Sequence, residues 1–390
     1  MIKKFLNELK IRKKVMEVFK AGDIRIKLES NKSKPKDKTT PNKYKYPKIH
    51  SIKVNDKQTT INFTIPNGFN PDKVHDKIYC FKQVFPGKKI KLEGDTKKFK
   101  LKIADATTVF KNYDYKYHEF SPLLCGHNLP IICGKDEDGN YFIYDMVHNP
   151  HLIIAGETGS GKSSQVRSIL STIFKFLKPE QLEAYLCDLK RSEFHLFRNI
   201  KHVKKYAKTI HELKPLLGKI SEEMKRRGDL FDEAEVDSIL SYNKVSDDKL
   251  SFILVVIDEV ALLQKEEDLM SVVEEISTIG RSLGVFLILS MQRPDYKVLD
   301  GKLKQNCTVR MGFKAADAIN SNIVGTPGSE DLEVSGRFLL KLTGLTEFQA
   351  PYLELDDAKQ LLEPLKCKSA KAKKSKEITE QEKLDLFGVL

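Results

Sequence analysis

The sequence predicts an α/β protein with a mostly parallel sheet that helices cover on both faces, together with a small N-terminal α/β module. Short runs of four to six apolar residues, typical of buried parallel strands, alternate with longer stretches of helical spacing. Two of these runs end in unusual residues, a glycine-rich turn after 152–155 and an acidic pair after 252–257. Strands that alternate with helices along a chain indicate an α/β fold.

Composition limits the class of protein. The chain has 390 residues, enough for one large domain and a smaller one. Its 67 Lys+Arg against 54 Asp+Glu give a formal net charge of +13, which favours a polyanionic partner; a lysine-rich composition without such a partner is the alternative. The six cysteines show no C-x-x-C pair or metal-ligand spacing, which indicates a reducing compartment. With no secretion signal and no apolar run near the roughly 20 residues that span a bilayer, we expect a cytoplasmic protein, either free or peripheral at the membrane.

The N-terminal part divides into two regions. Residues 1–30 contain a basic amphipathic helix over 1–20, which lies on a membrane surface or a partner, or packs on its own protein. Residues 31–105 predict a small α/β module with a basic linker. Its predicted elements are the linker, a strand, a helix and a second alternating, strand-like segment (31–49, 51–66, 72–85 and 88–102). The lysine-rich face of that last segment is either solvated surface or a nucleic-acid contact.

The alternating pattern continues from 106 to 355, which we interpret as the main domain. It opens with a hairpin around the turn Asp138-Gly139. The predicted strands are 152–155, 182–189, 252–257, 285–290, 307–313 and 337–342, of which 337–342 is expected to be the last. Helices are predicted between them, the longest over 209–231 and another over 269–283. Residues 356–390 form a basic tail that we expect to be disordered.

Residues 156–163 spell G-E-T-G-S-G-K-S, the spacing of a P-loop. Glycines let the backbone N–H groups turn inward around a phosphate, Lys162 reaches the β- and γ-phosphates, and the Ser163 hydroxyl can ligate Mg²⁺. A chance glycine-rich turn is the alternative, and the apolar strand before and helix after argue against it. We therefore predict that ATP and Mg²⁺ bind here. The binding residues are Gly156, Glu157, Thr158, Gly159, Ser160, Gly161, Lys162, Ser163 and Ser164.

Polar residues also end two later strands. Asp258 and Glu259 follow the buried run 252–257, about ninety residues after the P-loop. An aspartate there holds Mg²⁺ and a glutamate polarises the attacking water, which favours hydrolysis over kinase chemistry. Gln292 follows the next apolar strand, where it either senses the γ-phosphate or is a plain strand-end glutamine.

These motifs, in this order, resemble the FtsK/SpoIIIE family of DNA translocases. The resemblance covers roughly residues 125–345 and includes LPIICGKDEDGNYFIYDMVHNPHLIIAG, GETGSGKSS, CDLK, VVIDEVALL and GRSLGVFLILSMQRP. It implies a RecA-like P-loop NTPase core that assembles into hexameric rings and pumps double-stranded DNA. Lys162 and Ser163 match the family's P-loop, Asp258 and Glu259 its Walker B pair, and Gln292 its sensor.

The resemblance also implies roles for residues outside these motifs. Arg281 matches the arginine that acts across the subunit interface in similar ring motors; an ordinary surface arginine is the alternative, and Arg310 is the second candidate. Three lysines follow the sensor strand where the family has a DNA-contacting pore loop, and solvated lysines are the alternative there. They are Lys297, Lys302 and Lys304.

Departures from the family narrow the expected role. Chromosome translocases have membrane spans before the motor and a winged-helix module after it, and we recognise neither here. The chain resembles the short translocase-like proteins of Gram-positive conjugative elements and plasmids, which implies a coupling role with a relaxase and secretion-channel proteins as partners. The tip 383–387, KLDLF, resembles peptides that dock on the bacterial sliding clamp.

Two rival functions stay open. The first is an ATP-dependent pump for protein secretion, and the second is an ATP-gated adaptor that binds DNA or a relaxase with little turnover. A P-loop kinase is disfavoured because no acceptor-binding lid or second arginine-rich motif is evident.

Overall fold

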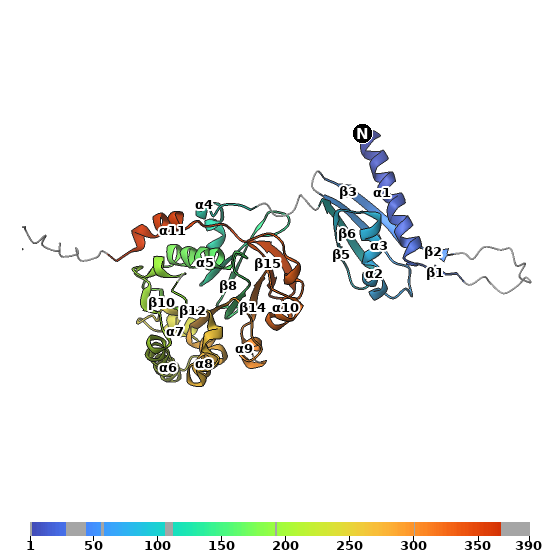
Figure 1. Ribbon diagram of the computed structural model, residues 1–390. Helices are drawn as coiled ribbons and strands as arrows, with labels where there is room; N and C mark the ends of the chain where they lie inside the picture. The colour runs from blue at the N-terminus through green and yellow to red at the C-terminus, as the bar shows by residue number, and fades with distance from the viewer. Residues whose placement is uncertain are drawn as a thin grey trace, which may run out of the picture. The chain divides into compact units, whose positions relative to one another are not determined.

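The computed structural model describes residues 2–28, 44–55, 58–105, 112–191, 193–299 and 301–367. They form two compact units, divided between residues 111 and 112, and each is described by itself (Figure 1). The tip 383–387, for which we predict clamp docking, lies outside the described residues.

The first unit is built on an antiparallel sheet. Its strands stand in the order β3-β4-β6-β5. They are β3 (Lys48–Val54), β4 (Gln58–Thr64), β5 (Lys88–Glu93) and β6 (Lys98–Asp105), with a two-stranded pair, β1 (Ile26–Lys27) and β2 (Tyr44–Lys45), beside them. Its helices are α1 (Ile2–Ala21), α2 (Asp72–Asp76) and α3 (Ile78–Val84), so the single helix predicted over 72–85 is broken at Lys77.

Helix α1 packs on its own unit. Val15, Val18 and Phe19 are fully buried in one core with Phe63 and Phe81. This packing supports the prediction of a helix held by its own protein for the second half of α1. On β6, Phe99, Leu101 and Ile103 face this core while the alternate lysines face away. Whether that lysine face contacts nucleic acid stays a prediction.

The second unit contains a ten-stranded sheet in the order β11-β10-β12-β13-β9-β14-β15-β16-β7-β8. The first six strands of this order run parallel to one another, and the last four are antiparallel. Their bounds are β7 Pro130–Lys135, β8 Tyr141–Asp145, β9 Leu152–Ala155, β10 Leu182–Asp188, β11 Val203–Ala207, β12 Phe252–Asp258, β13 Val285–Met291, β14 Val309–Phe313, β15 Arg337–Lys341 and β16 Leu345–Gln349. The predicted α/β fold with a mostly parallel sheet is confirmed.

Helices cover both faces of this sheet (Figure 1). Leu254 and Val256 of β12 belong to one core with helix α5, whereas Ile253, Val255 and Ile257 belong to the other core with α6 and α8. Alternate residues of a strand point to opposite faces, so a strand covered on both sides must be apolar throughout. The helices are α4 (Tyr117–Phe120), α5 (Lys162–Phe176), α6 (Ile210–Glu233), α7 (Ile239–Val245), α8 (Glu267–Leu283), α9 (Gly301–Asn306), α10 (Ala318–Val324) and α11 (Leu355–Leu362).

Two strands of this sheet depart from the prediction. β11 lies where the sequence shows only a basic segment, and β16 follows the strand predicted to be the last. Both are half exposed, so they lack the apolar run by which buried strands are recognised. Among the described residues, no helix is long and apolar enough to cross a membrane.

Candidate nucleotide-binding site

The glycine-rich loop joins β9 to α5 at the carboxyl edge of the parallel strands. Gly161 has φ 100°, in the left-handed region that glycine tolerates, and α5 begins at the next residue. A Cβ atom at Gly161 would lie 2.5 Å from the Gly336 nitrogen. The Ser160 carbonyl accepts a hydrogen bond from that nitrogen at 2.8 Å, and the Ser335 hydroxyl donates to the Gly159 carbonyl at 3.0 Å. Residues 335 and 336 thus hold the loop in place, and the N-terminus of α5 can accept an anion.

Lys162 is turned towards the neighbouring strand ends. Its Nζ atom lies 2.7 Å from the Ser290 hydroxyl and 3.5 Å from Oδ1 of Asp258. Both charged side chains are buried, at 5% and 4% side-chain exposure. The two residues predicted to act on phosphate and metal therefore meet directly.

Ser163 contacts a carboxylate to which the sequence assigned no role. Its hydroxyl donates to Oε1 of Glu193 at 2.5 Å. Glu193 follows β10, where the Asp188 carboxylate accepts the backbone N–H groups of Glu193 at 3.2 Å and Phe194 at 3.1 Å. Tyr206 donates its hydroxyl to the same carboxylate at 2.8 Å. Burial is the main cause that raises the pKa of Tyr206, and this hydrogen bond is the second. Asp188 thereby fixes the segment that presents Glu193.

Glu259 is held from two sides. Oε2 accepts a hydrogen bond from Nζ of Lys190 at 2.5 Å, and both carboxylate oxygens accept the backbone N–H of Gln292, at 3.2 and 3.1 Å. The Glu259 backbone is left-handed, with φ 61° and ψ 60°, which is uncommon for a residue other than glycine. The residue predicted to polarise water is therefore tied to β10 and to the end of β13.

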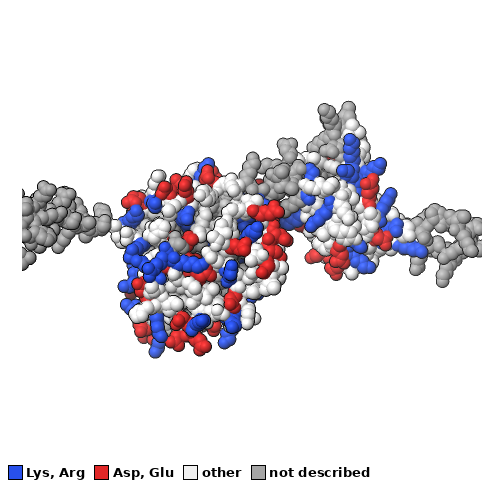
Figure 2. All heavy atoms as spheres, viewed as in Figure 1, with Lys and Arg blue, Asp and Glu red and all other residues white. Residues whose placement is uncertain are grey.

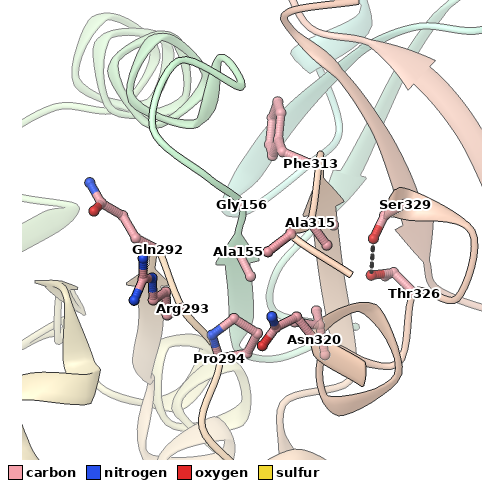
Figure 3. Close-up of a pocket in the computed structure, with 13 residues that line it drawn as sticks. Ala155, Gly156, Gln292, Arg293, Pro294, Phe313, Ala315, Asn320, Thr326 and Ser329 are labelled. Atoms are coloured by element: carbon pink, nitrogen blue, oxygen red, sulfur yellow. Dashed lines mark hydrogen bonds between the residues drawn. The ribbon is translucent and has the colours of Figure 1, made fainter. Parts of the chain in front are cut away.

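A pocket lies beside the P-loop (Figure 3). Ala155 and Gly156 stand at its centre, with Gln292 and Arg293 on one side and Thr326 and Ser329 on the other. The hydroxyls of Thr326 and Ser329 lie 3.4 Å apart. Gln292 thus borders the P-loop, as its predicted sensing role requires.

The residues present fit a nucleotide-bound Mg²⁺ ion. In the described parts of the chain, no cluster of three or more His, Cys, Asp or Glu side chains is arranged to hold a metal alone. Mg²⁺ in nucleotide sites needs only one or two protein ligands beside phosphate and water. Ser163, Asp258 and Glu193 supply oxygen atoms of the kind that Mg²⁺ prefers.

The two candidate arginines differ in their surroundings. Arg281 is exposed in the last turn of α8, where its Nε donates to the Val147 carbonyl at 3.2 Å. Arg310 of β14 is half buried and donates to the Lys304 carbonyl, and burial lowers the pKa of its guanidinium. Arg281 is thus exposed at the surface, whereas Arg310 is half buried and hydrogen-bonded within its own unit.

The three candidate DNA-contacting lysines do not share one environment. Lys297 lies exposed in the loop after β13, and Lys302 is exposed on α9. Lys304 donates to the Asn322 carbonyl at 3.1 Å. Burial is the main cause that lowers the pKa of its amine, and the positive charge of the nearby Arg310 is the second.

Comparison with known proteins agrees with this geometry. Residues 126–296 match the model of the FtsK/SpoIIIE family. The chain carries an FtsK/SpoIIIE domain. It is 32% identical to the DNA translocase FtsK of Borreliella burgdorferi over 254 residues, which cover 61% of this chain and 32% of that protein. It is 33% identical to the DNA translocase FtsK of Helicobacter pylori J99, over 61% of this chain and 30% of that protein. The chain thus spans about a third of the length of these relatives.

Solved structures share the fold of this FtsK/SpoIIIE domain. The conjugation coupling protein TcpA of pCW3, in a monomer form with ATPγS, superposes with a TM-score of 0.60 and 25% identity, over 82% of this chain and 94% of that chain. ATPases 2 and 3 of EssC from Geobacillus thermodenitrificans superpose with a TM-score of 0.57 and 24% identity, over 61% of this chain and 48% of that chain.

The sequence left two residues of the FtsK/SpoIIIE site without a role. Lys190 and Glu193 contact Glu259 and Ser163, which lie 69 and 30 positions away along the chain. The polar residues after the apolar run 182–187 were the available signal, because the carboxyl ends of neighbouring parallel strands meet at one edge.

Proposed function

We propose that this chain is an ATP-driven motor that moves double-stranded DNA, as a coupling protein in the conjugative transfer or maintenance of a mobile element. The observation that carries the proposal is the convergence of Lys162, Ser163, Asp258, Glu259 and Gln292 at one edge of the sheet. The names of the FtsK relatives and the match to TcpA over 94% of that chain support DNA as the cargo and coupling as the role.

The chemistry follows from the residues that converge. When ATP binds, Lys162 exchanges Ser290 and Asp258 for the β- and γ-phosphates. Ser163 and Asp258 would hold Mg²⁺, which supplies positive charge against the phosphates when bound. Glu259 accepts the proton of the attacking water, and Gln292, whose backbone already contacts Glu259, reports on the γ-phosphate.

Assembly and cargo complete the proposed motor. We expect a hexameric ring in which Arg281 of one subunit reaches the phosphates held by its neighbour. Lys297 and Lys302 would contact DNA phosphates without reading sequence. On the face of the second unit seen in Figure 2, a band of Lys and Arg crosses the middle, while acidic and basic residues are mixed along the edges. A relaxase, secretion-channel proteins and the sliding clamp stay as proposed partners.

A protein-secretion motor is the second candidate. The type VII secretion ATPase EccC of Thermomonospora curvata superposes with a TM-score of 0.55 and 25% identity, over 61% of this chain and 31% of that chain. A pump for proteins would hydrolyse ATP without responding to DNA, and so would an adaptor with slow turnover.

The first test is the rate of ATP hydrolysis by the purified chain, with and without linear duplex DNA, across protein concentration. We expect strong stimulation by DNA with a steep dependence on concentration, because the active site needs a neighbour. A slow rate that DNA leaves unchanged would contradict the DNA motor.

A variant at the P-loop tests the ATPase assignment. Lys162→Ala should abolish turnover while thermal unfolding stays cooperative, since its charge is needed on the phosphates. Lys175→Ala, an exposed position in the last turn of the same helix, should keep it. Undiminished ATP turnover in Lys162→Ala would contradict the assignment of the chain as a P-loop ATPase.

A further inference from the structure

We propose that Lys190 is a positioning residue that holds Glu259 in an ion pair and restrains ATP hydrolysis until that pair is broken. The proposal rests on the role given above to Glu259 as the residue that accepts a proton from water. It adds a step of activation that is separate from nucleotide binding.

The sheet register brings the two residues together. β10 and β12 are parallel neighbours, with Asp188 opposite Asp258. The residues just beyond these aspartates therefore share one edge of the sheet, and Lys190 Nζ lies 2.5 Å from Oε2 of Glu259. The Lys190 side chain is 31% exposed and that of Glu259 is 6% exposed. The lysine can thus leave towards solvent, whereas the carboxylate stays inside.

The pair leaves Glu259 poorly placed to act as a base. One oxygen accepts the ammonium of Lys190, and both share the backbone N–H of Gln292. The ammonium at this distance occupies Oε2, so that oxygen is not available to accept a hydrogen bond from the attacking water. The Glu259 backbone is also left-handed, a strained conformation of the kind that clusters at functional sites.

The contact between Lys190 and Glu259 involves no residue of the P-loop. The triphosphate replaces Asp258 and Ser290 as partners of Lys162, since Lys162 belongs to the P-loop. Lys190 belongs to the segment after β10, which the Asp188 carboxylate anchors through Glu193 and Phe194. Its release from Glu259 therefore needs a movement of that segment or of the lysine side chain, and this movement is the step that we assign to activation.

The test compares Lys190→Met with Lys190→Arg in steady-state ATP hydrolysis by the full chain, with and without saturating linear duplex DNA. Lys190→Met should raise kcat without DNA about fivefold, which corresponds to about 1 kcal/mol at 1.36 kcal/mol per tenfold, and leave KM for ATP unchanged. The stimulation factor with DNA should fall accordingly. Lys190→Arg keeps the positive charge, so its kcat without DNA should stay close to that of wild type.

A matched lysine serves as the control. Lys204 lies on the neighbouring strand β11 with 43% of its side chain exposed, and its Nζ lies 3.9 Å from Oε1 of Glu183 near the start of β10. Lys204→Met should leave kcat, KM and stimulation at wild-type values. Thermal unfolding of each variant shows whether the fold is intact.

The double variant Lys190→Met with Glu259→Gln shows whether the gain passes through Glu259. It should have no more turnover than Glu259→Gln alone. A gain that survives in the double variant, an unchanged kcat in Lys190→Met, or a loss of kcat there would each overturn the proposal. The comparison without DNA stands by itself, so a wild-type chain that ignores DNA would contradict the DNA motor and still leave this restraint measurable.

Discussion

At the scale of single residues, Glu193 lies outside the sequence motifs and yet contacts the P-loop residue Ser163 directly. A serine hydroxyl has one proton to donate and two lone pairs to offer. By accepting the proton of Ser163 at 2.5 Å, Glu193 leaves the oxygen lone pairs free for a cation and adds negative charge beside them. Glu193 therefore orients Ser163 for Mg²⁺ without needing to ligate the ion.

This orientation predicts a defect in metal-dependent nucleotide binding. Glu193→Gln should weaken the binding of ATPγS at limiting Mg²⁺ by about tenfold, because an amide is neutral and a poorer acceptor for the hydroxyl proton. The measurement is a titration of ATPγS binding against Mg²⁺ concentration. Glu180→Gln, an exposed position before β10, should titrate like wild type, and an unaltered titration of Glu193→Gln would remove Glu193 from the metal site.

The P-loop could be read from the sequence because its function is local. Gly161, Lys162 and Ser163 are adjacent, and their spacing alone specifies a phosphate-binding turn. The contacts of Lys190 and Glu193 could not be read in this way. They depend on the order β10-β12-β13 and on register, which no local pattern contains.

At the scale of elements, one buried arginine joins a helix to two strand starts. Arg227 of α6 is 2% exposed, and its guanidinium donates to the Leu283 carbonyl at 2.8 Å and the Ser251 carbonyl at 2.9 Å. Its Nε also donates to Glu223 at 2.8 Å. Burial lowers the pKa of Arg227, and Glu223 opposes that shift. The residue thus satisfies carbonyl groups just before β12 and β13.

Removing this arginine should destabilise the second unit. Arg227→Met leaves the Leu283 and Ser251 carbonyls without a donor in the interior, which should cost about 3 kcal/mol in the free energy of unfolding. Arg226→Met should cost less than about 1 kcal/mol, since Arg226 contacts the same Glu223 but is 52% exposed. Chemical denaturation measures both, and equal losses in the two variants would contradict the role of Arg227.

The fully buried strands were the most directly predictable from the sequence. β12 and β13 have at most one residue that is not fully buried, and their apolar runs indicate them directly. β11 and β16 lie half exposed and read as polar segments. These segments are strands because they pair with a neighbouring strand. Sequence periodicity does not show which segments pair or in what register.

At the scale of the whole molecule, Arg281 and the P-loop site lie on the same chain, but Arg281 need not act on the site of its own subunit. The known contact of Arg281 is the Val147 carbonyl, and the P-loop contacts described above do not include it. A subunit whose arginine completes the site of its neighbour hydrolyses ATP only when assembled. Turnover would then depend on DNA or a partner that gathers subunits.

Mixing two inactive variants tests this dependence. Lys162→Ala and Arg281→Ala should each lack turnover with DNA. In an equal mixture, a site with intact Lys162 meets a neighbour with intact Arg281 in about a quarter of interfaces, so about a quarter of wild-type turnover should return if each interface works alone. Lys162→Ala mixed with the double variant should recover nothing, because no site then has both residues. Absence of recovery in the first mixture would mean that Arg281 acts within its own subunit or takes no part, since only action across an interface lets one variant complement the other.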